Sequence, residues 1–548
     1  MDIVTIALAT LATIGRILLL IVLSVLTGWG LAYLAIRSRK FENAYVPLVN
    51  VLESIPVIAF LPIVLLVFIQ GLGGFWGVEI AADFLVFDAV SWNVWIGAYQ
   101  AFKTVPEHLL EVSENYGFSF GRKMWKLYIP HSIPRVTSNL FSSFADAFFY
   151  ITVSEVFTVG VKTYQTFGIG TLIANFVQQS DFIDVYYSLI FIAIGVIAVT
   201  ALLNILSRRG VAKYGLDTSL EIGHGSHLGR RFRAVDVFRS RTRYISRYAR
   251  KITHPTHPAH RGEFEGEVGP PTPLRQIMKV VMKSLAFCMG AIMLLYLAYS
   301  SLLIALAVPR EEWQGFLAAT PYLLYSMGAD YLRVIVVTLV SLGVAMTLGY
   351  ALATRHKASL ILAPIVQAIS AFPAPAYFPL VFIATYPFFS ATLPPAYSTE
   401  IYVFTLGFLS CFYYVFFDFW IGVQSIPTQF WEVMRNYDLS WRTRMRRIIL
   451  PGTFPYLVTG ISSTINSAWA GIEIGEYWPN IDGKHSLEVH DGMMKYIGLN
   501  MAKGNVANAA WVSLLFAIVV AIYGIVFTRN LMDLARKKYV VEEGVYAA

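Results

Sequence analysis

The sequence has few charged residues for its length. Only 14% of its 548 residues are Asp, Glu, Lys or Arg, whereas 56% are hydrophobic. Soluble domains carry about 25% charged residues. Several apolar runs approach the roughly 20 residues that an α-helix needs to cross a bilayer. The composition therefore excludes an ordinary soluble protein and predicts an all-α polytopic membrane protein.

Cysteine and the common catalytic motifs are also scarce. The two cysteines, Cys288 and Cys411, lie in apolar runs, so we expect small buried side chains and no disulfide or metal site. The chain lacks a G-x-x-x-x-G-K-[ST] loop, because GKHS at 483–486 has no leading Gly at the required spacing. It also lacks H-E-x-x-H and paired-cysteine signatures. We therefore expect no metal, cofactor or catalytic centre on this chain, and any ATP hydrolysis must occur elsewhere.

The net charge of +8 is concentrated in one segment. Residues 208–275 hold 14 Lys or Arg and 6 Asp or Glu, so the rest of the chain sums to zero. Its HPTHPAH and GPPTP stretches oppose regular structure. We interpret 208–275 as a basic cytoplasmic linker. Nucleic-acid binding, or metal binding by His254, His257 and His260, is the weaker interpretation, since such charge runs also face anionic lipid.

Apolar runs and basic clusters predict the topology. The runs lie at about 8–36, 46–70, 84–102, 130–158, 185–207, 276–308, 329–354, 359–386, 399–421, 452–476 and 507–530. The clusters after the first, fifth, seventh and eleventh runs fall on one side if the N-terminus is outside and the C-terminus is cytoplasmic. No basic region precedes the first run and no small-residue cleavage site follows it, so a cleavable signal peptide is not expected.

The chain repeats itself at an offset of 321 residues. Pro106, Glu111, Pro130 and Glu155 recur as Pro427, Glu432, Pro451 and Glu476. Upstream, Pro56 and Pro62 recur as Pro373 and Pro379 at an offset of 317. Six predicted spans lie between the two copies, and an even number returns the chain to the same face. We therefore predict two parallel units of five and six spans, 1–207 and 276–548, related by a pseudo-two-fold axis along the membrane normal.

The repeated loop carries the most informative motif. Its copies are EVSENYGFSFGRKMWKLYIP (111–130) and EVMRNYDLSWRTRMRRIILP (432–451). They resemble the EAA loop of permease subunits of binding-protein-dependent ABC importers, which has Glu, then Gly six residues later, and a closing Pro. Asp438 stands where Gly is usual. The flanking ESIPVIAFLPIV (53–64) and SAFPAPAYFPLV (370–381) resemble the nitrate, taurine and sulfonate branch, and the resemblance covers nearly all of the chain except the linker.

The resemblance implies a mechanism and partners. In the family, each loop forms two short helices that insert into an ATPase subunit. The resemblance therefore implies two cytoplasmic ATPases that carry ATP and Mg. It also implies an extracytoplasmic solute-binding protein and location in the plasma or inner membrane. The implied coupling residues are Glu111, Gly117, Arg122, Lys123, Pro130, Glu432, Asp438, Arg442, Arg446 and Pro451. Independently, Gly reaches a positive φ easily and Asp tolerates it, so both loops can turn. Each Pro can begin the following span, where its missing N–H is harmless.

Polar residues within the spans are candidates for a pathway or gate. They are Asn139, Ser142, Ser143, Asp146, Glu155, Ser463, Thr464, Asn466, Ser467, Glu473 and Glu476. Glu155 and Glu476 occupy matched positions near the outer span ends. Each could form part of a gate, or it could equally be an interfacial carboxylate in contact with water. The small polar residues could serve helix packing instead. Acidic residues near the pathway do not suit the anionic solute that the branch resemblance suggests, because like charges repel.

Two other functions compete with this interpretation. A secondary transporter with parallel repeats would need coupling-ion sites and no ATPase, but it has no need of two matched docking loops. A membrane-embedded enzyme would need a nucleophile, base and metal arrangement that does not recur in the spans. Co-purification of an ATPase that bears a nucleotide-binding loop separates the importer from both.

Overall fold

The computed structural model describes residues 3–53, 55, 57–71, 73–214, 306, 308–355, 362, 365–424 and 426–523. These ranges include both copies of the repeated loop and the spans that flank it. Most of the predicted linker, most of the predicted span 276–308 and the end of the last predicted span lie outside the described residues.

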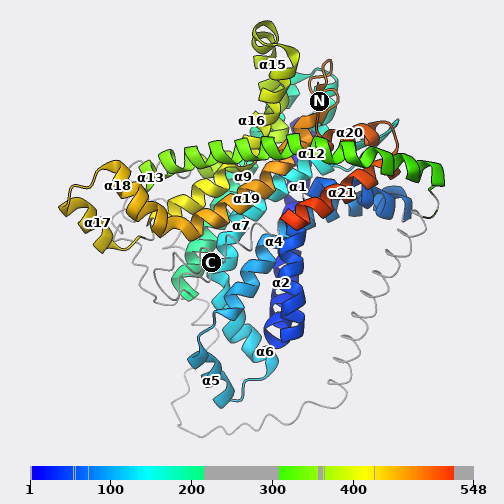
Figure 1. Cartoon of the computed structure of the whole chain (residues 1–548). Helices are drawn as coiled ribbons and strands as arrows, with labels where there is room; N and C mark the ends of the chain where they lie inside the picture. Colours follow the sequence, from blue (N-terminus) through cyan, green and yellow to red (C-terminus); the bar gives the residue numbers. More distant parts are fainter. Residues whose placement is uncertain are drawn as a thin grey trace, which may run out of the picture. The chain divides into compact units, whose positions relative to one another are not determined.

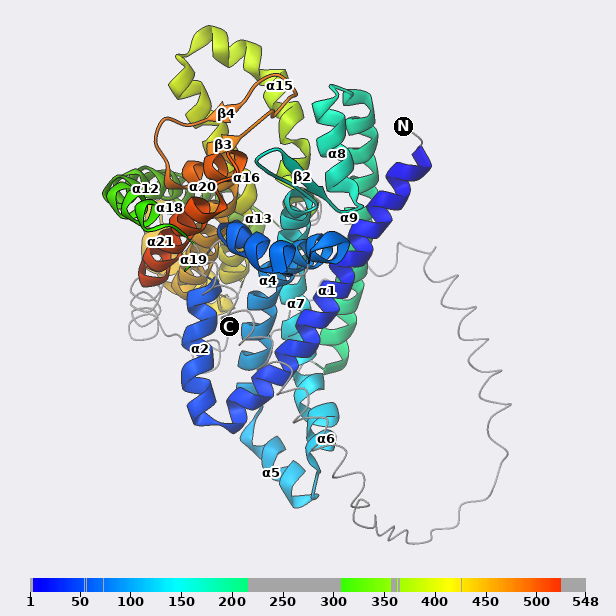
Figure 2. The same ribbon diagram turned by 90° about the vertical axis from the view of Figure 1, so that its right-hand side faces the viewer.

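The first half is a series of helices interrupted once by a hairpin (Figure 1). The elements are α1 (Ile3–Arg37), α2 (Arg39–Glu53), η1 (Val57–Phe60), α3 (Leu61–Val64), η2 (Leu65–Gln70), α4 (Gly74–Lys103), α5 (Glu107–Asn115), α6 (Phe120–Lys123), η3 (Met124–Tyr128), α7 (Ile129–Ser154), β1 (Val156–Val159), β2 (Lys162–Gln165), α8 (Ile169–Gln178) and α9 (Phe182–Tyr214). Figure 2 shows α1 running alongside α9, and both helices also contact α7.

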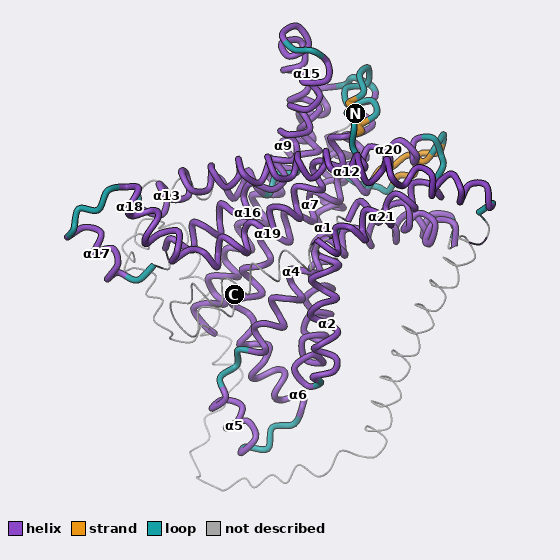
Figure 3. Tube along the Cα trace, viewed as in Figure 1, coloured by secondary structure: helices purple, strands orange, loops and turns teal. Residues whose placement is uncertain are grey.

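From the repeated loop onward, the second half presents the same order of elements. They are α12 (Arg310–Val344), η5 (Ala345–Gly349), α13 (Tyr350–Thr354), α15 (Ala374–Thr392), α16 (Pro395–Gln424), α17 (Thr428–Asn436), α18 (Trp441–Arg444), η6 (Met445–Ile449), α19 (Leu450–Glu476), β3 (Tyr477–Trp478), β4 (Leu487–Glu488), α20 (Met493–Ala502) and α21 (Val506–Tyr523). Each half thus has a loop of two short helices, a long helix, a hairpin and a further short helix in sequence (Figure 3).

Eight helices of the described part are long and apolar enough to cross a membrane, fewer than the eleven spans predicted. They are Ile3–Arg37, Gly74–Lys103, Phe182–Leu206, Arg310–Thr354, Ala374–Thr392, Pro395–Gln424, Trp441–Glu476 and Val506–Tyr523. The predicted span at 130–158 is a helix of 26 residues, α7, but it is more polar than these eight. The predicted span at 276–308 lies almost wholly outside the described residues.

The predicted span at 46–70 is wrong as a single helix. It consists of the end of α2, the 3₁₀ turn η1, the short α3 and the π-helical η2. Pro62 lies in α3, and Pro56 lies outside the described residues. Proline removes a backbone donor, and its ring clashes with the carbonyl four residues earlier, so two prolines six residues apart break a regular helix.

Apolar side chains fill the interior and also cover the outside. Ile17, Val90 and Phe148 are fully or almost fully buried in one cluster of the first half, as are Trp469 and Phe516 in a cluster of the second. In contrast, large apolar side chains along α1 and α9 stay exposed, including Leu19 at 66% and Ile194 at 59%. Exposed apolar surface of this extent fits helices whose outer face contacts lipid.

Small residues let α16 and α19 pack closely. A Cβ atom at Gly460 would lie 2.8 Å from the Val415 Cα, and one at Gly471 would lie 2.4 Å from the Ser410 Oγ. Because lipid competes with apolar contacts between helices, membrane helices associate through such close backbone approach. Across the same interface, Ser467 Oγ donates to the Ser410 carbonyl at 3.0 Å.

Candidate functional site

The first repeated loop folds as two short helices around a glycine turn. Helix α5 ends at Asn115, Gly117 has φ 59°, and α6 begins at Phe120. The Phe118 N–H donates to the Ser113 carbonyl at 2.9 Å, which satisfies an acceptor that the end of α5 leaves free. Glycine closes the first helix in a conformation that L side chains rarely adopt.

The second loop repeats this geometry with aspartate at the turn. Asp438 has φ 42°, and the Leu439 N–H donates to the Met434 carbonyl at 3.3 Å. The prediction that Asp438 would keep the turn is therefore confirmed. Aspartate is one of the few non-glycine residues that visit this region. Both loops then begin their second helix after a serine, Ser119 and Ser440.

Both loops carry exposed aromatic side chains among their charges. Tyr116 is 74% exposed and its counterpart Tyr437 is 76% exposed, while Phe120 and Trp441 are 48% and 57% exposed. The predicted coupling residues Glu111, Gly117, Arg122, Glu432, Asp438, Arg442 and Arg446 are all exposed, whereas Lys123 is half-buried. Lys123 donates to Glu114 at 3.0 Å, a contact that the sequence did not predict. Exposed aromatic groups in matched positions mark surfaces that a partner can cover.

Pro130 and Pro451 lie at the start of regular α-helix, but helical winding begins ten residues earlier. α6 and η3 lead into α7 without interruption, and α18 and η6 lead into α19 in the same way. In each case a five-residue π-helical segment lies before the proline, with one residue between them. A π-turn widens the backbone where the proline would otherwise clash with a carbonyl of the previous turn.

The structure brings some of the predicted pathway residues to one cavity. Asp146, Ser463, Asn466 and Ser467 line it, together with residues of α2, η1, α4 and α16. Asn139, Ser142, Ser143 and Thr464 make helix contacts instead. For example, Asn139 Nδ2 donates to the Asn93 carbonyl at 2.9 Å, and the Val415 N–H donates to Thr464 Oγ1 at 3.1 Å.

Glu155 lies in a buried ion-pair network of the first half. Its side chain is completely buried, and its Oε1 lies 3.4 Å from Arg16 Nη1. Thr13 Oγ1 donates to Glu155 at 2.6 Å, and the Gly170 N–H donates to it at 2.7 Å. Arg16 also contacts Glu79 at 2.5 Å. The network therefore joins α1, α4 and α7 to the first turn of the short helix α8.

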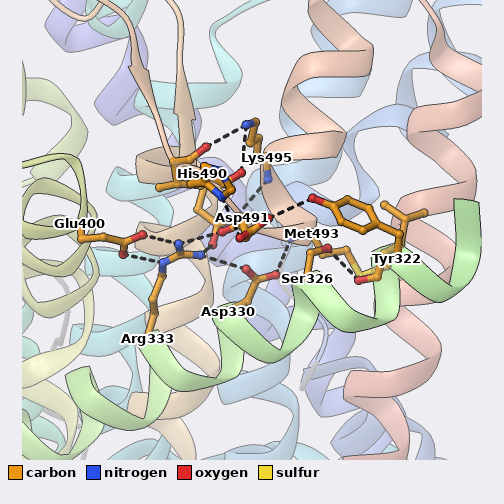
Figure 4. Close-up of polar contacts among 12 residues, drawn as sticks. Tyr322, Ser326, Asp330, Arg333, Glu400, His490, Asp491, Met493 and Lys495 are labelled. Atoms are coloured by element: carbon orange, nitrogen blue, oxygen red, sulfur yellow. Dashed lines mark hydrogen bonds and ion pairs between the residues drawn. The ribbon is translucent and has the colours of Figure 1, made fainter. Parts of the chain in front are cut away.

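Glu476 occupies the matching network of the second half. Figure 4 shows Arg333 of this network between Asp330 and Glu400. Arg333 Nη1 donates to Glu476 at 2.8 Å and to Asp330 at 3.1 Å, and the guanidinium binds both oxygens of Glu400. The Lys495 N–H donates to Glu476 at 3.0 Å, and the Met493 N–H donates to Asp330 at 2.8 Å. These bonds join α12, α16 and α19 to the first turn of α20.

Most members of the two networks occupy matched positions, although Phe404 stands where Asp83 of the first network would recur. Arg16 and Arg333 are 317 residues apart, as are Thr13 and Asp330, while Glu79 and Glu400 are 321 apart. These are the offsets of the sequence repeat. Sequence reasoning identified the two glutamates but missed both arginines. A basic residue inside an apolar run at offset 317 was the available signal.

Figure 4 also shows a polar fringe, formed by Tyr322, His490 and Asp491, beside the second network. Tyr322 Oη donates to Asp491 at 2.9 Å, and the His490 ring hydrogen-bonds the same carboxylate at 2.8 Å. These two bonds hold the pKa of Asp491 below its usual value. The Asp491 carbonyl accepts from Arg333 at 2.8 Å, so the fringe connects to the buried network.

One family model matches this chain in each half. The family described as binding-protein-dependent transport system inner membrane component matches residues 21–213 and again residues 343–539. The putative aliphatic sulfonates transport permease protein SsuC of Bacillus subtilis is 24% identical over 102 residues, 17% of this chain and 37% of that protein.

Two further relatives carry other solute names. The bicarbonate transport system permease protein CmpB of Synechocystis sp. is 25% identical over 189 residues, 34% of this chain and 63% of that protein. The nitrate import permease protein NrtB of Leptolyngbya laminosa is 27% identical over 154 residues, 28% of this chain and 51% of that protein. The chain thus spans less than two thirds of the length of these relatives. Because the two family matches together cover well over half of the chain, it belongs to the inner membrane components of binding-protein-dependent transport systems and is a membrane permease subunit.

Proposed function

We propose that this chain forms the complete solute pathway of an ATP-driven importer from two fused permease units. The units are 1–207 and 276–548, and the basic segment 208–275 joins them on the cytoplasmic side. In this proposal the chain has eleven spans, five in the first unit and six in the second. The two units are related by a pseudo-two-fold axis along the membrane normal. The N-terminus lies outside and the C-terminus lies in the cytoplasm.

The observation that carries the proposal is the pair of matched loops. Each presents an exposed glutamate, Glu111 or Glu432, beside an exposed tyrosine and a positive-φ turn. Two copies of one exposed surface suit two copies of one partner, because a docking element that serves a single site need not be duplicated. We therefore assign the two loops to two cytoplasmic ATPase subunits, which bind ATP and Mg.

We propose the remaining partners by analogy with the family. A solute-binding protein on the extracytoplasmic side delivers the solute, the bilayer surrounds the helices, and nucleic acid has no part. The chain itself binds no cofactor and is not an enzyme in this proposal. The alternative is a secondary transporter with the same parallel repeats and no ATPase.

Native mass measurement of the complex purified from its source tests the proposal. We expect one copy of this chain with two ATPase subunits, because both coupling loops reside on a single polypeptide. Two copies of the chain in each complex would contradict the fused-pathway assignment. Purification without any ATPase, combined with solute uptake driven by an ion gradient, would favour the secondary transporter.

A further inference from the structure

The cavity that Asp146 lines is acidic and aromatic. Its charged lining residues are Glu53 and Asp146, and none of the described residues that line it is Lys, Arg or His. The aromatic side chains of Trp92, Tyr150 and Tyr414 complete the wall with amide and hydroxyl groups. These residues come from α2, α4, α7, α16 and α19, so both halves of the chain contribute to the lining.

The two carboxylates are held differently. Asp146 is 8% exposed, accepts a hydrogen bond from the Tyr414 hydroxyl, and lies 3.3 Å from Asn93 Nδ2. Glu53 is half-buried and makes no hydrogen bond or ion pair within the described part of the chain. Neutral donors thus orient Asp146, whereas Glu53 is left to face the cavity. Among the described residues that line the cavity, none is a cation that could balance either carboxylate.

The buried arginines do not supply the missing charge. Arg16 is shared by Glu79, Asp83 and Glu155. Arg333 is likewise shared by Asp330, Glu400 and Glu476. Within the described part of the chain, each of these two guanidinium groups therefore already faces three carboxylates.

A further carboxylate extends the acidic face beyond the cavity. Glu473 lies seven residues after the lining residue Asn466, which places both on one face of α19, two turns apart. It is 6% exposed, and both of its oxygens are buried without a hydrogen-bond partner. A buried carboxylate without a donor is costly, so such a group in a membrane protein indicates a ligand or ion path.

We propose that the pathway of this chain selects a positively charged solute, a small amine or quaternary ammonium compound, at the cavity between Glu53, Asp146 and the three aromatic rings. This inference rests on the proposed function, because it assigns a solute class to the pathway. Carboxylates balance the charge of such a solute, and aromatic faces attract an ammonium group within about 6 Å of the ring centroid. Tyr414 both orients Asp146 and contributes a ring.

The same cavity disfavours the anions named for the relatives. Like charges a few ångströms apart repel each other more strongly in a protein interior than in water, because the effective dielectric constant is lower there. A sulfonate, bicarbonate or nitrate ion in this cavity would meet two carboxyl groups and, among the described lining residues, no cation. The solute class of this chain therefore differs from the classes that the relatives' names state.

Thermal unfolding of the purified full-length chain in lipid nanodiscs tests the solute class. The probes are ammonium, tetramethylammonium, choline and spermidine as chlorides, against sodium nitrate, sodium bicarbonate and sodium isethionate at equal ionic strength. We expect at least one ammonium probe to raise the melting temperature and the three anions to have no effect.

Variants locate the effect at the cavity. Glu53→Gln should weaken the response about 10-fold or more, the range for loss of a charged hydrogen bond. Because Glu53 bonds nothing in the described part, this change should leave the fold intact, and Asp146→Asn provides a second variant. Glu311→Gln, an exposed carboxylate of α12, is the matched control and should respond as the unaltered chain does.

Three results would overturn the inference: no response to any ammonium probe, stabilisation by an anion, or an ammonium response that both cavity variants retain. The measurement needs no ATPase. Failure here with an intact ATPase complex would therefore refute the solute class alone, whereas loss of the complex would refute the proposed function.

Discussion

Single residues at the two loop turns decide whether the paired short helices can form. Gly117 and Asp438 occupy the same position of the repeat, and both take a positive φ. Nothing lies within 4 Å of where a Cβ would stand at Gly117. The constraint at this position is therefore conformational and not steric, which explains why aspartate can replace glycine there.

Gly117→Ala should loosen the first loop. An alanine forced into the left-handed region costs about 1–2 kcal/mol, which corresponds to a roughly 5- to 30-fold larger open population. Trypsin cleavage after Arg122 and Lys123 should accelerate by that factor. Gly121→Ala lies in α6 with free space around it and is the control. Equal cleavage rates in both variants would contradict the turn assignment.

Glu111→Ala and Glu432→Ala should each reduce solute-coupled ATP hydrolysis in the reconstituted complex. Removing a charged hydrogen bond that docking buries costs about 1.5–3 kcal/mol, or roughly 10- to 150-fold in docking affinity. Because both residues are exposed in the chain alone, its stability should change by no more than about 0.5 kcal/mol. The two variants need not be equal, since the turns differ. Lys162→Ala, on the exposed β2, is the control, and full coupling in both glutamate variants would refute the mechanism.

Short elements at the far end of each half depend on the buried networks. The helices α8 and α20 have ten residues each, too few to be stable alone in water. Their first N–H groups donate to Glu155 and to Glu476 with Asp330. A carboxylate at a helix start accepts hydrogen bonds from free N–H groups and interacts favourably with the positive end of the helix dipole. The networks thus fix both short helices against the long ones.

Gly168→Ala and Gly492→Ala should disrupt these networks. A Cβ at Gly168 would lie 1.9 Å from Glu155 Oε1, and one at Gly492 would lie 2.2 Å from Glu476 Oε2. Displacing the carboxylate leaves a buried arginine short of a partner, and breaking a buried ion pair costs about 3–5 kcal/mol. We expect a lower melting temperature in nanodiscs for each variant. Gly15→Ala, in α1 with open space, should melt as the unaltered chain does; similar melting of all three would argue against tight networks.

The whole molecule repeats one arrangement twice, while the residues that line its cavity differ between the halves. The loops, hairpins, short helices and arginine networks recur in both halves. In the cavity, however, Asp146 corresponds to Ser467, and Asn93 corresponds to Tyr414, each at offset 321. A single-chain duplication allows this divergence, because each half can change without altering its copy. The pathway can therefore be asymmetric although the supporting structure is repeated.

Labelling by a membrane-impermeant thiol reagent should place the loops and hairpins on opposite sides of the membrane. Phe120–Ser154 winds as one helical run, and its α7 part alone spans about 39 Å at 1.5 Å per residue. In a background without native cysteines, Lys162→Cys should label in intact cells and Glu107→Cys should label only after lysis. Both positions are exposed. The reverse pattern would invert the proposed orientation.

Local sequence patterns determined the class of this protein, the repeat and the loops. Apolar runs reflect burial in lipid residue by residue, and the turn at Gly117 or Asp438 depends on backbone preferences within a few residues. Such features need no knowledge of distant contacts, which is why the family, the paired loops and the tolerance of Asp438 followed from the sequence. The same reasoning misjudged the segment 46–70, where apolar character hid the effect of its prolines on helix continuity.

Only the tertiary structure decided which polar groups meet. Arg16 pairs with carboxylates 63 and 139 residues away, and Tyr414 bonds Asp146 from the other half of the chain. The sequence could show that these groups were costly inside a membrane, but a partner is fixed by how helices pack and rotate. Glu155 and Asp146 looked alike as carboxylates in one span. Packing placed an arginine beside Glu155 and left Asp146 in a cavity whose described lining holds no cation. Two residues nine positions apart on a helix point in different directions and so meet different neighbours.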